Sequence, residues 1–253
     1  MVKKSIFITG AASGIGKATA LLFAEKGWFV GLYDVNESAL ESLAKTIGTQ
    51  TCCYKKTDVT NSTSVNNAIE HFSGFTDGKM DLLFNCAGIL HMGFFDEIDL
   101  DLQIKTIEVN FLGVIQCIHA SLPLLKQTER SKIVNMNSSS SVYGTPELAT
   151  YSATKFALKG LTEALNLEFE RFGIHVCDIM VPYVNTPLLD QKRKAVSIDR
   201  LGVKTEPGQV AHLVWKASIK KKTHWSLGLK PLLLLSWLFP FAKKTMVRLV
   251  TGV

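Results

Sequence analysis

The chain has 253 residues, 47% of them hydrophobic, which is enough to bury the core of one α/β domain, and we expect a single domain over residues 1–253. Its net charge of +6 is uneven, because residues 207–253 contain eight Lys and Arg but no Asp or Glu, whereas residues 1–206 contain 20 basic and 22 acidic residues. The basic residues of the tail are interleaved with leucines and not with stacking aromatic residues, so nucleic-acid binding is not expected.

The first ten residues contain two lysines and an apolar stretch of five residues, too short for a signal peptide or a membrane span. Export is therefore not expected, and we predict a cytoplasmic protein. The cysteines show no metal-ligand spacing, and their odd number suits a reducing compartment, so we interpret them as small core residues and predict no metal site. They are Cys52, Cys53, Cys86, Cys117 and Cys177.

Short apolar runs alternate with longer segments of helical periodicity, which is the pattern of βα units in a parallel sheet. Strands are predicted at residues 5–9, 28–34, 51–55, 80–85, 132–137 and 174–181. Helices are predicted to begin near Gly14, Asn36, Ser62, Leu100 and Ala149. Most strands are almost entirely apolar, so we predict a Rossmann-like, doubly wound parallel sheet with helices on both faces.

Two polar residues precede predicted helices and are placed to cap them. Asn61 stands before the helix near Ser62, and Asp99 before the helix near Leu100.

The sequence TGAASGIG, residues 9–16, follows the first strand and opens the first helix. Glycines in such a loop let the main chain approach a pyrophosphate, while the helix N-terminus offers N–H groups to its charge. We therefore predict a dinucleotide-binding loop. Its candidate contacts are Gly10, Ser13, Gly14, Ile15 and Gly16.

Asp34 ends the second strand, about 20 residues after the loop, where a carboxylate can accept hydrogen bonds from an adenosine ribose and repel a 2′-phosphate. This position favours NAD over NADP. The alternative is that Asp34 only caps the helix that begins near Asn36.

Tyr151 and Lys155 lie four positions apart in a helix predicted at residues 149–172, so their side chains share one face. An ammonium beside a phenol favours the phenolate and lowers its pKa from about 10 toward the range in which it can exchange a proton. The same spacing arises by chance in a chain with 5 tyrosines and 23 lysines, so the pair gains meaning only from other motifs.

The other motifs are present in a specific order. TGAASGIG, Asp58–Val59, NCAG at 85–88, Asn110, Ser138 and the pair Tyr151 and Lys155 together resemble the motif set of the classical short-chain dehydrogenase/reductase family. The resemblance extends over nearly the whole chain. It implies an oxidoreductase that transfers hydride between nicotinamide and an alcohol or ketone.

The resemblance also implies a catalytic role for four residues. Tyr151 would be the general acid or base, Lys155 its cationic partner, Ser138 the hydrogen-bond donor to the reacting oxygen, and Asn110 the holder of a water between Lys155 and solvent. Two alternatives remain open. Ser138 is one of four consecutive serines that could form a plain polar turn, and Asn110 could only cap or kink its helix.

Cofactor contacts are implied by the same resemblance. They are Asp58, Val59, Asn85, Ala87, Gly88, Tyr151, Lys155, Val184 and Thr186. The chain departs from the family pattern at two places: Cys86 replaces the second asparagine of NNAG, and PYVNT lacks the usual glycine before the nicotinamide contact. Among the histidines, His91 is the one expected near the substrate.

The helix that carries Tyr151 has more apolar surface than a helix on one sheet needs. One stripe comprises Ala153, Ala157, Gly160, Ala164 and Leu167, and a neighbouring stripe comprises Leu158, Leu161, Leu165 and Phe169. We therefore expect a homodimer or homotetramer, formed through this helix and the one around Asn110, as the family resemblance also implies.

The C-terminal segment at residues 230–253 is apolar and basic. THWSLGL at 223–229 fits a seventh strand, and the 12-residue apolar run at 231–242 is too short to span a bilayer and contains Pro240. The run fits a core or dimer-interface segment, a lid over a lipophilic pocket, or a peripheral contact with a membrane surface. The ending resembles family members that act on lipophilic alcohols.

Two functions remain at this stage. The first is an NAD-dependent oxidoreductase of a lipophilic alcohol or ketone. The second is a non-catalytic NAD-binding protein whose tail anchors it to a membrane or partner, and the complete set Asn110, Ser138, Tyr151 and Lys155 argues against it.

Overall fold

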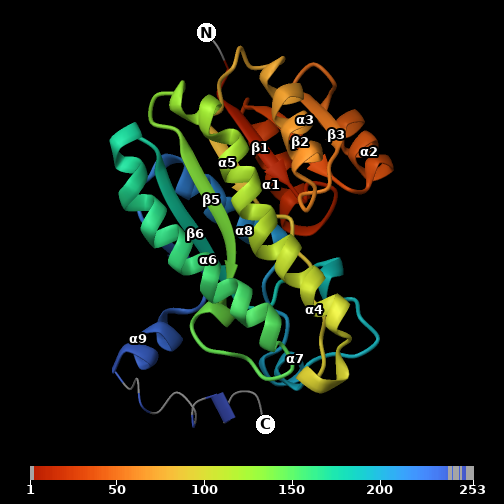
Figure 1. Cartoon of the computed structure of the whole chain (residues 1–253), viewed down its shortest axis with the longest axis vertical. Coiled ribbons are helices and arrows are strands. Elements are labelled where there is room, and N and C mark those ends of the chain that lie inside the picture. Colours follow the sequence, from red (N-terminus) through yellow and green to blue (C-terminus); the bar gives the residue numbers. More distant parts are fainter. Residues whose placement is uncertain (1–2, 239–240, 242–244, 246, 249–253) are drawn as a thin grey trace.

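The computed structural model describes residues 3–238, 241, 245 and 247–248, and its centre is a seven-stranded parallel sheet in the order β3-β2-β1-β4-β5-β6-β7 (Figure 1). The strands are β1 Ser5–Thr9, β2 Phe29–Asp34, β3 Cys52–Lys56, β4 Leu82–Asn85, β5 Lys132–Ser138, β6 His175–Val181 and β7 His224–Ser226. The predicted doubly wound sheet is confirmed.

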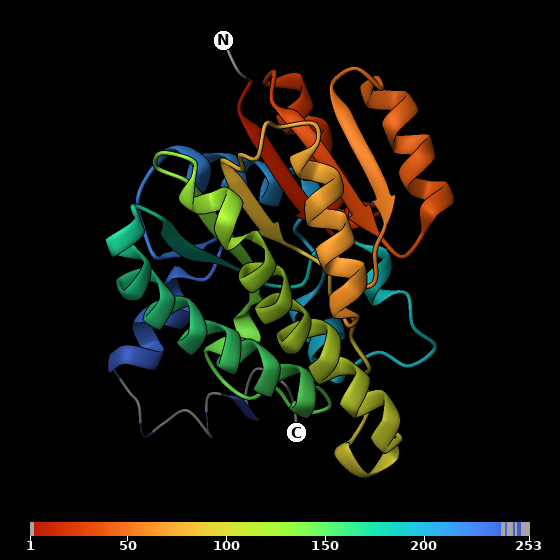
Figure 2. The same ribbon diagram turned by 45° about the horizontal axis from the view of Figure 1, so that its top comes forward.

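Helices cover both faces of the sheet because the strands alternate their buried side chains between two apolar layers. Ile6 and Ile8 of β1 pack into one layer, and Phe7 between them packs into the other. The first layer is closed by α1 Gly14–Glu25, α2 Glu37–Ile47 and α8 Pro207–Ile219. The second is closed by α3 Ser62–Ser73, α5 Gly113–Lys126 and α6 Ala149–Glu168, the three helices that stand before the strands in Figure 2.

Helix starts agree closely with the predicted ones, but the caps do not all agree. Asn61 Oδ1 accepts a hydrogen bond from the Ser64 N–H at 2.9 Å, as predicted for a cap. Asp99 precedes α4 (Leu100–Ile107), yet its side chain caps no N–H group, so that prediction is wrong. A polar residue directly before a helix is therefore not always a cap, because its side chain must also point back toward the N–H groups of the first turn.

A π-helical turn at Glu108–Leu112 joins α4 to α5 and carries Asn110. Where α5 begins, a Cβ at Gly113 would stand 2.8 Å from Val59 Cγ2, so glycine allows this helix to approach the end of β3. The whole segment from Leu100 to Lys126 is long and apolar enough to span a membrane by length and composition alone. One side of it packs into the second apolar layer, as the core helix of a soluble domain does.

In the described part of the chain, β7 is followed by the helix α9 Lys230–Leu238. Leu232 and Leu233 pack against the buried residues Val142, Tyr143 and Met180. This contact places the start of the predicted apolar run on the body of the protein. The part of the run at 239–240 and 242, and the basic residues Lys243 and Lys244, lie outside the described residues.

Candidate active site

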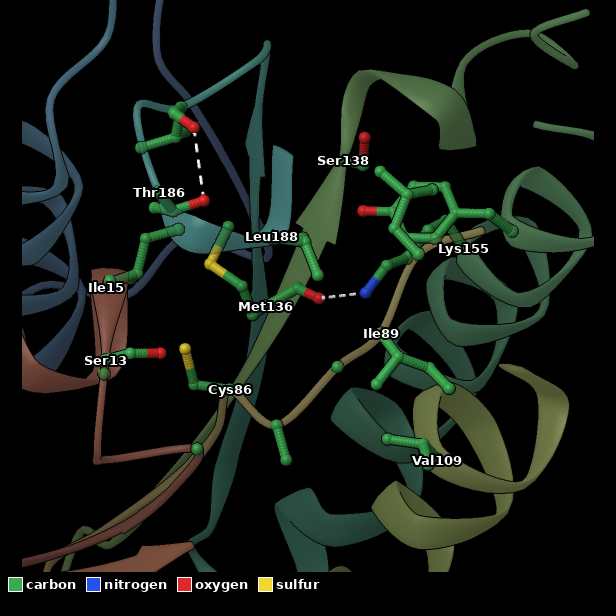
Figure 3. A pocket seen from close by; sticks show the side chains of 18 of the residues that line it. Ser13, Ile15, Cys86, Ile89, Val109, Met136, Ser138, Lys155, Thr186 and Leu188 are labelled. Carbon is green, nitrogen blue, oxygen red and sulfur yellow. Dashed lines mark hydrogen bonds between the residues drawn. The ribbon is translucent and has the colours of Figure 1, made fainter. Parts of the chain in front are cut away.

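A cavity of about 540 Å³ opens at the carboxyl ends of the parallel strands, where ligands of doubly wound sheets bind (Figure 3). Most of the predicted site residues line it. They are Gly10, Ser13, Gly14, Ile15, Gly16, Asp34, Asp58, Val59, Ala87, Gly88, Ser138, Tyr151, Lys155, Val184 and Thr186.

The glycine loop has the close main-chain packing that a phosphate cradle requires. A Cβ at Gly16 would stand 2.0 Å from the Gly10 carbonyl oxygen, and one at Gly10, where φ is +69°, would stand 2.8 Å from Ala87 Cα. Gly14 begins α1 with φ of +50°, and the Ser13 side chain caps no N–H group and faces the cavity (Figure 3). Without Cβ atoms in the way, main-chain N–H groups at the start of α1 can approach a pyrophosphate, so the loop fits one.

Asp34 lies at the cavity edge and is held by the main chain. Its Oδ2 accepts from the Ala12 N–H at 3.1 Å, and its Oδ1 accepts from the Asn36 N–H at 3.0 Å. The cap of α2 is Asn36 itself, whose Oδ1 accepts from the Ala39 N–H, so Asp34 is not the helix cap. Because a carboxylate has about four acceptor positions, two remain for ribose hydroxyls.

Asp58 and Val59 form the neighbouring wall after β3. Although burial raises the pKa of Asp58, hydrogen bonds from the Thr60 N–H and hydroxyl and the charge of Lys105 lower it below its ordinary value. The carboxylate is therefore ionised and fixed at neutral pH. Asp58 and Val59 both line the cavity.

Asn85 and Asn110 stand behind the cavity wall and not in it. Asn85 Nδ2 donates to Asn135 Oδ1 at 2.9 Å. Asn110 is bonded at both ends of its amide to Ile89: Oδ1 accepts from the N–H and Nδ2 donates to the carbonyl, each at 2.8 Å. Both residues thus brace the NCAG segment against β5 and the π-helical turn.

Tyr151, Lys155 and Ser138 line the same cavity, and the Ser138 hydroxyl is hydrogen-bonded to the Tyr151 phenol. Figure 3 shows the side chains of Ser138 and Lys155 on the same side of this cavity. Lys155 Nζ donates to the Met136 carbonyl at 2.9 Å and lies 5.4 Å from the centroid of the Tyr151 ring. The i, i+4 spacing in α6 therefore brings the two side chains together, as predicted.

Burial dominates the protonation of both groups. It raises the pKa of Tyr151 to about 12, while the hydrogen bond with Ser138 lowers it. It lowers the pKa of Lys155 to about 8, while nearby Cys86 and Asp178 raise it. Burial therefore opposes the effect expected from the lysine charge alone, and the Ser138 hydroxyl is the neighbour that favours the phenolate.

The nicotinamide-side loop is fixed by pairing with a distant segment. Val184 forms a parallel bridge with Thr205, and Thr186 Oγ1 donates to the Val184 carbonyl at 3.2 Å. A Cβ at Gly14 would stand 3.0 Å from Thr186 Cγ2, so this loop touches the glycine loop. Tyr183, which follows Pro182 where glycine is usual, bonds its hydroxyl to Ser197 Oγ at 2.6 Å and lines the cavity.

Several cavity residues were not predicted from the sequence. The apolar ones form one side of the cavity, and they are Leu90, Leu102, Leu148, Leu188 and Leu189. Cys86, interpreted as core, also lines the cavity, with the pKa of its thiol raised to about 12 by burial. His91 was expected near the substrate, and it lines the cavity with Nδ1 bonded to Thr106 Oγ1 at 3.0 Å.

Residues 4–197 match the family model described as short chain dehydrogenase. The chain belongs to this family. Short-chain dehydrogenases are oxidoreductases with a Rossmann fold that binds NAD(P), and the sheet and cavity described above have this form.

The similar family members include reductases and dehydrogenases that are named for different substrates. The chain is 37% identical to 3-ketodihydrosphingosine reductase of Bacteroides thetaiotaomicron over 195 residues, which cover 76% of this chain and 68% of that one. It is 33% identical to 2,5-dichloro-2,5-cyclohexadiene-1,4-diol dehydrogenase LinX of Sphingobium indicum, covering 79% of this chain and 83% of that one.

A solved short-chain dehydrogenase/reductase from Burkholderia phymatum, in complex with NAD, superposes with a TM-score of 0.85 at 26% identity. The match covers 96% of this chain and 95% of that one. The shared fold therefore extends beyond the residues that the family model matches.

Proposed function

We propose that the protein is an NAD-dependent oxidoreductase that transfers hydride between nicotinamide and a lipophilic alcohol or ketone. The observation that carries the proposal is the meeting of Ser138, Tyr151 and Lys155 at the floor of a cavity with a glycine loop on one side and leucines on the other. A nicotinamide bound in this cavity supplies the hydride acceptor or donor. The remaining step is the transfer of a proton to or from the substrate oxygen, and side chains of this protein carry it out.

Tyr151 is the proposed general acid and base. In reduction its neutral phenol, the form that burial favours, donates a proton to the carbonyl oxygen, and in oxidation the phenolate accepts it. Ser138 donates a hydrogen bond to the same oxygen and holds it beside the phenol. Lys155 stabilises the phenolate by its charge, and Asn110 is proposed to hold a water that connects Lys155 to solvent.

The cofactor preference follows from Asp34. A 2′-phosphate on the adenosine ribose would stand beside a carboxylate held in place by two main-chain N–H groups, and this repulsion supports NAD over NADP. The NAD bound in the Burkholderia phymatum structure is consistent with this preference.

The substrate class follows from the apolar side of the cavity. Leu90, Leu148 and Leu189 belong to one apolar cluster against which Leu188 packs, and these leucines line the cavity together with Leu102. A polar substrate would lose its hydration against this side without replacement. The similarity to enzymes named 3-ketodihydrosphingosine reductase supports the same class.

Tyr151→Phe tests the catalytic assignment, with lipophilic alcohols and ketones screened against both cofactors. We expect turnover to fall by about 10²-fold or more while the dissociation constant for NADH stays within a factor of two. Tyr54→Phe removes a hydroxyl from β3, outside the cavity, and is the matched control. Retention of a tenth of kcat in Tyr151→Phe contradicts the assignment.

A homodimer or homotetramer through α5 and α6 is also proposed. The stripe of α6 that contains Leu167 is exposed apart from half-buried Ala157, whereas Leu158 and Phe169 of the neighbouring stripe are buried in the core. Ile104, Leu112 and Ile115 are exposed beside it on the α4–α5 segment. Such a continuous apolar face supports burial against a second copy.

The second proposed surface is a peripheral membrane contact through α9. Leu232 and Leu233 fix one face of the helix on the protein, while Leu234, Trp237 and Leu238 are exposed on the other, with Trp237 75% exposed. Since residues 207–253 carry eight basic residues and no acidic ones, the fitting occupant is an anionic lipid surface. No described residue after Leu189 lines the cavity, so the lid interpretation has no support among them.

Co-sedimentation of the full-length protein with vesicles of anionic lipid tests this contact. We expect binding that weakens with salt and falls at least several-fold in Trp237→Ser, because a large apolar contact is lost. Phe75→Ser, at an exposed aromatic residue after α3, is the control. If Trp237→Ser dissociates an oligomer and leaves vesicle binding unchanged, the segment is an interface between copies.

A further inference from the structure

Asp178, in the middle of β6, is a fully buried carboxylate that the proposed chemistry does not use. Two side chains bond it. Asn137 Nδ2 donates to Oδ2 at 2.8 Å, and His224 Nδ1 lies 2.9 Å from Oδ1. A buried carboxylate is costly unless it is paired, so this residue needs a structural or functional reason.

On one side the bonds lead to the proposed active site. Asn137 directly precedes Ser138, and its Oδ1 accepts from the Ser138 N–H at 2.8 Å. The orientation of the amide is determined, because exchanging its oxygen and nitrogen would place an acceptor against Asp178 and a donor against an N–H group. Asp178 therefore fixes the side-chain amide of Asn137, and this amide in turn fixes the main chain of Ser138.

On the other side the bonds lead to the surface. His224 of β7 lies between two carboxylates, with Nδ1 at Asp178 and Nε2 3.1 Å from Glu163 Oε1 on α6. The hydrogen bond that His224 donates to Asp178 raises the pKa of His224 above its ordinary value; burial and Lys159 lower it, and the charge of Glu163 raises it. A protonated imidazole donates to both carboxylates.

Strand register explains why these residues meet. Asp178 is aligned with Asn135 of β5 on one side and with His224 of β7 on the other, and Asn137 is two residues further along the same face. Helix α6 covers this face and brings Lys155 to the Met136 carbonyl, between Asn135 and Asn137. Asp178 is thus near Lys155, and its charge raises the pKa of that ammonium while burial lowers it to about 8.

We propose that Asp178 is a positioning residue of the active site, which orients Ser138 through Asn137 and whose negative charge keeps Lys155 protonated, with His224 as its counter-ion. This inference rests on the proposed function for the roles of Ser138 and Lys155. Asp178 then has two effects on the site: its hydrogen bonds orient Ser138, and its charge acts on Lys155.

The charge effect gives a pH dependence. Three groups face Lys155: Cys86 after β4, Tyr151 on the same helix and Asp178 on β6. Asp178 is faced in turn by His224 of β7, which lies beside Glu163 and Lys159 of α6. Removal of the Asp178 charge lowers the pKa of Lys155 below about 8. The alkaline decline of kcat/KM should then move to lower pH.

Asp178→Asn and Asn137→Ala test the two effects. In Asp178→Asn we expect kcat to fall by about tenfold, as for a displaced catalytic group, and the alkaline decline to move to lower pH. In Asn137→Ala we expect a similar fall of kcat without the pH shift, because the charge remains. Asp81→Asn, whose carboxylate accepts from the Ser5 N–H at the other end of the sheet, is the control and should keep both values.

Titration of Lys155 by NMR of ¹³C-labelled lysine, with the signal assigned by Lys155→Arg, reports the charge effect without turnover. We expect a lower midpoint in Asp178→Asn than in the unchanged protein. An unchanged midpoint, or unchanged kcat in both variants while Tyr151→Phe is inactive, overturns the inference and leaves the proposed function intact. Turnover retained in Tyr151→Phe refutes the proposed function instead, and the NMR midpoint still decides the charge effect.

Discussion

The two sides of the cavity are built in different ways. The proposed cofactor side consists of main chain and small residues, such as Gly10, Gly14 and Gly16, all within one loop of eight residues. The proposed substrate side consists of large apolar side chains, such as Leu90 and Leu188, that come from distant segments. A ligand site built from main chain can therefore be predicted from a short sequence motif. A cavity wall built from side chains of distant segments cannot, because it depends on how the chain folds.

This difference predicts opposite sensitivities. The cofactor side has no space for an added methyl group, because its atoms already stand at contact distance. The substrate side surrounds a cavity of about 540 Å³, so a shortened side chain changes its volume without disturbing the fold. A larger side chain in the glycine loop should therefore weaken cofactor binding, whereas a shorter side chain among the leucines should change the affinity for the substrate.

The largest effect is expected for Gly16→Ala. The new Cβ would stand 2.0 Å from the Gly10 carbonyl, so the loop must move away from its bound conformation. We expect NADH affinity to fall by about 10²-fold or more, measured by fluorescence titration. Gly160→Ala, where a Cβ meets nothing within 4 Å, is the control and should stabilise α6 by about 0.5–1 kcal/mol. Equal affinities in the two variants would show that the loop is not a phosphate cradle.

Asp34→Ala tests the one charged side chain proposed for cofactor selection. We expect the unchanged protein to bind NADH more tightly than NADPH by about tenfold or more, because a carboxylate would face the 2′-phosphate. The variant should reduce this ratio, while Glu37→Ala, an exposed carboxylate in the first turn of α2, should not. A preference of the unchanged protein for NADPH contradicts the ribose assignment.

Leu188→Ala enlarges the substrate side. The loss of three carbons should raise KM for a long-chain substrate by about tenfold, since each methylene contributes about 0.8 kcal/mol when fully buried and Leu188 is half-buried. NADH affinity should not change. Leu201→Ala, on an exposed position of the short helix α7 (Val196–Leu201), is the control. An equal rise of KM in both variants would mean that the leucine does not touch the substrate.

The smallest effect is expected at His224, which belongs to neither side of the cavity. Its pKa is raised in the folded protein, so its contribution to stability is complete below the ordinary value and is lost as pH rises through the raised value. His224 is 31% exposed, and solvent screening limits the contribution to about 1 kcal/mol or less. Urea unfolding should show His224→Gln less stable than the unchanged protein at pH 5.5 and nearly equal at pH 9. A difference independent of pH would exclude the charge as its cause.

Features carried by local spacing could be predicted from the residues alone. The alternation of apolar runs predicted the parallel sheet, the glycines predicted a loop without room for side chains before α1, and the interval between Tyr151 and Lys155 predicted their contact. Each depends on backbone geometry within a few residues, which the sequence encodes directly. The cap predicted at Asp99 was wrong because a cap also depends on a side-chain rotamer, which position does not specify.

Features that join distant segments were decided by tertiary structure. The exposure of Cys86 to the cavity, the wall of leucines and the contact of Tyr183 with Ser197 depend on which loops meet above the sheet. The bonds among Asn137, Asp178 and His224 require three strands in one register. Burial also has the largest influence on the pKa of Tyr151, which it raises. The sequence alone shows which chemical groups each residue carries. The neighbours of that residue and its burial are determined only when the sheet and its helices pack together.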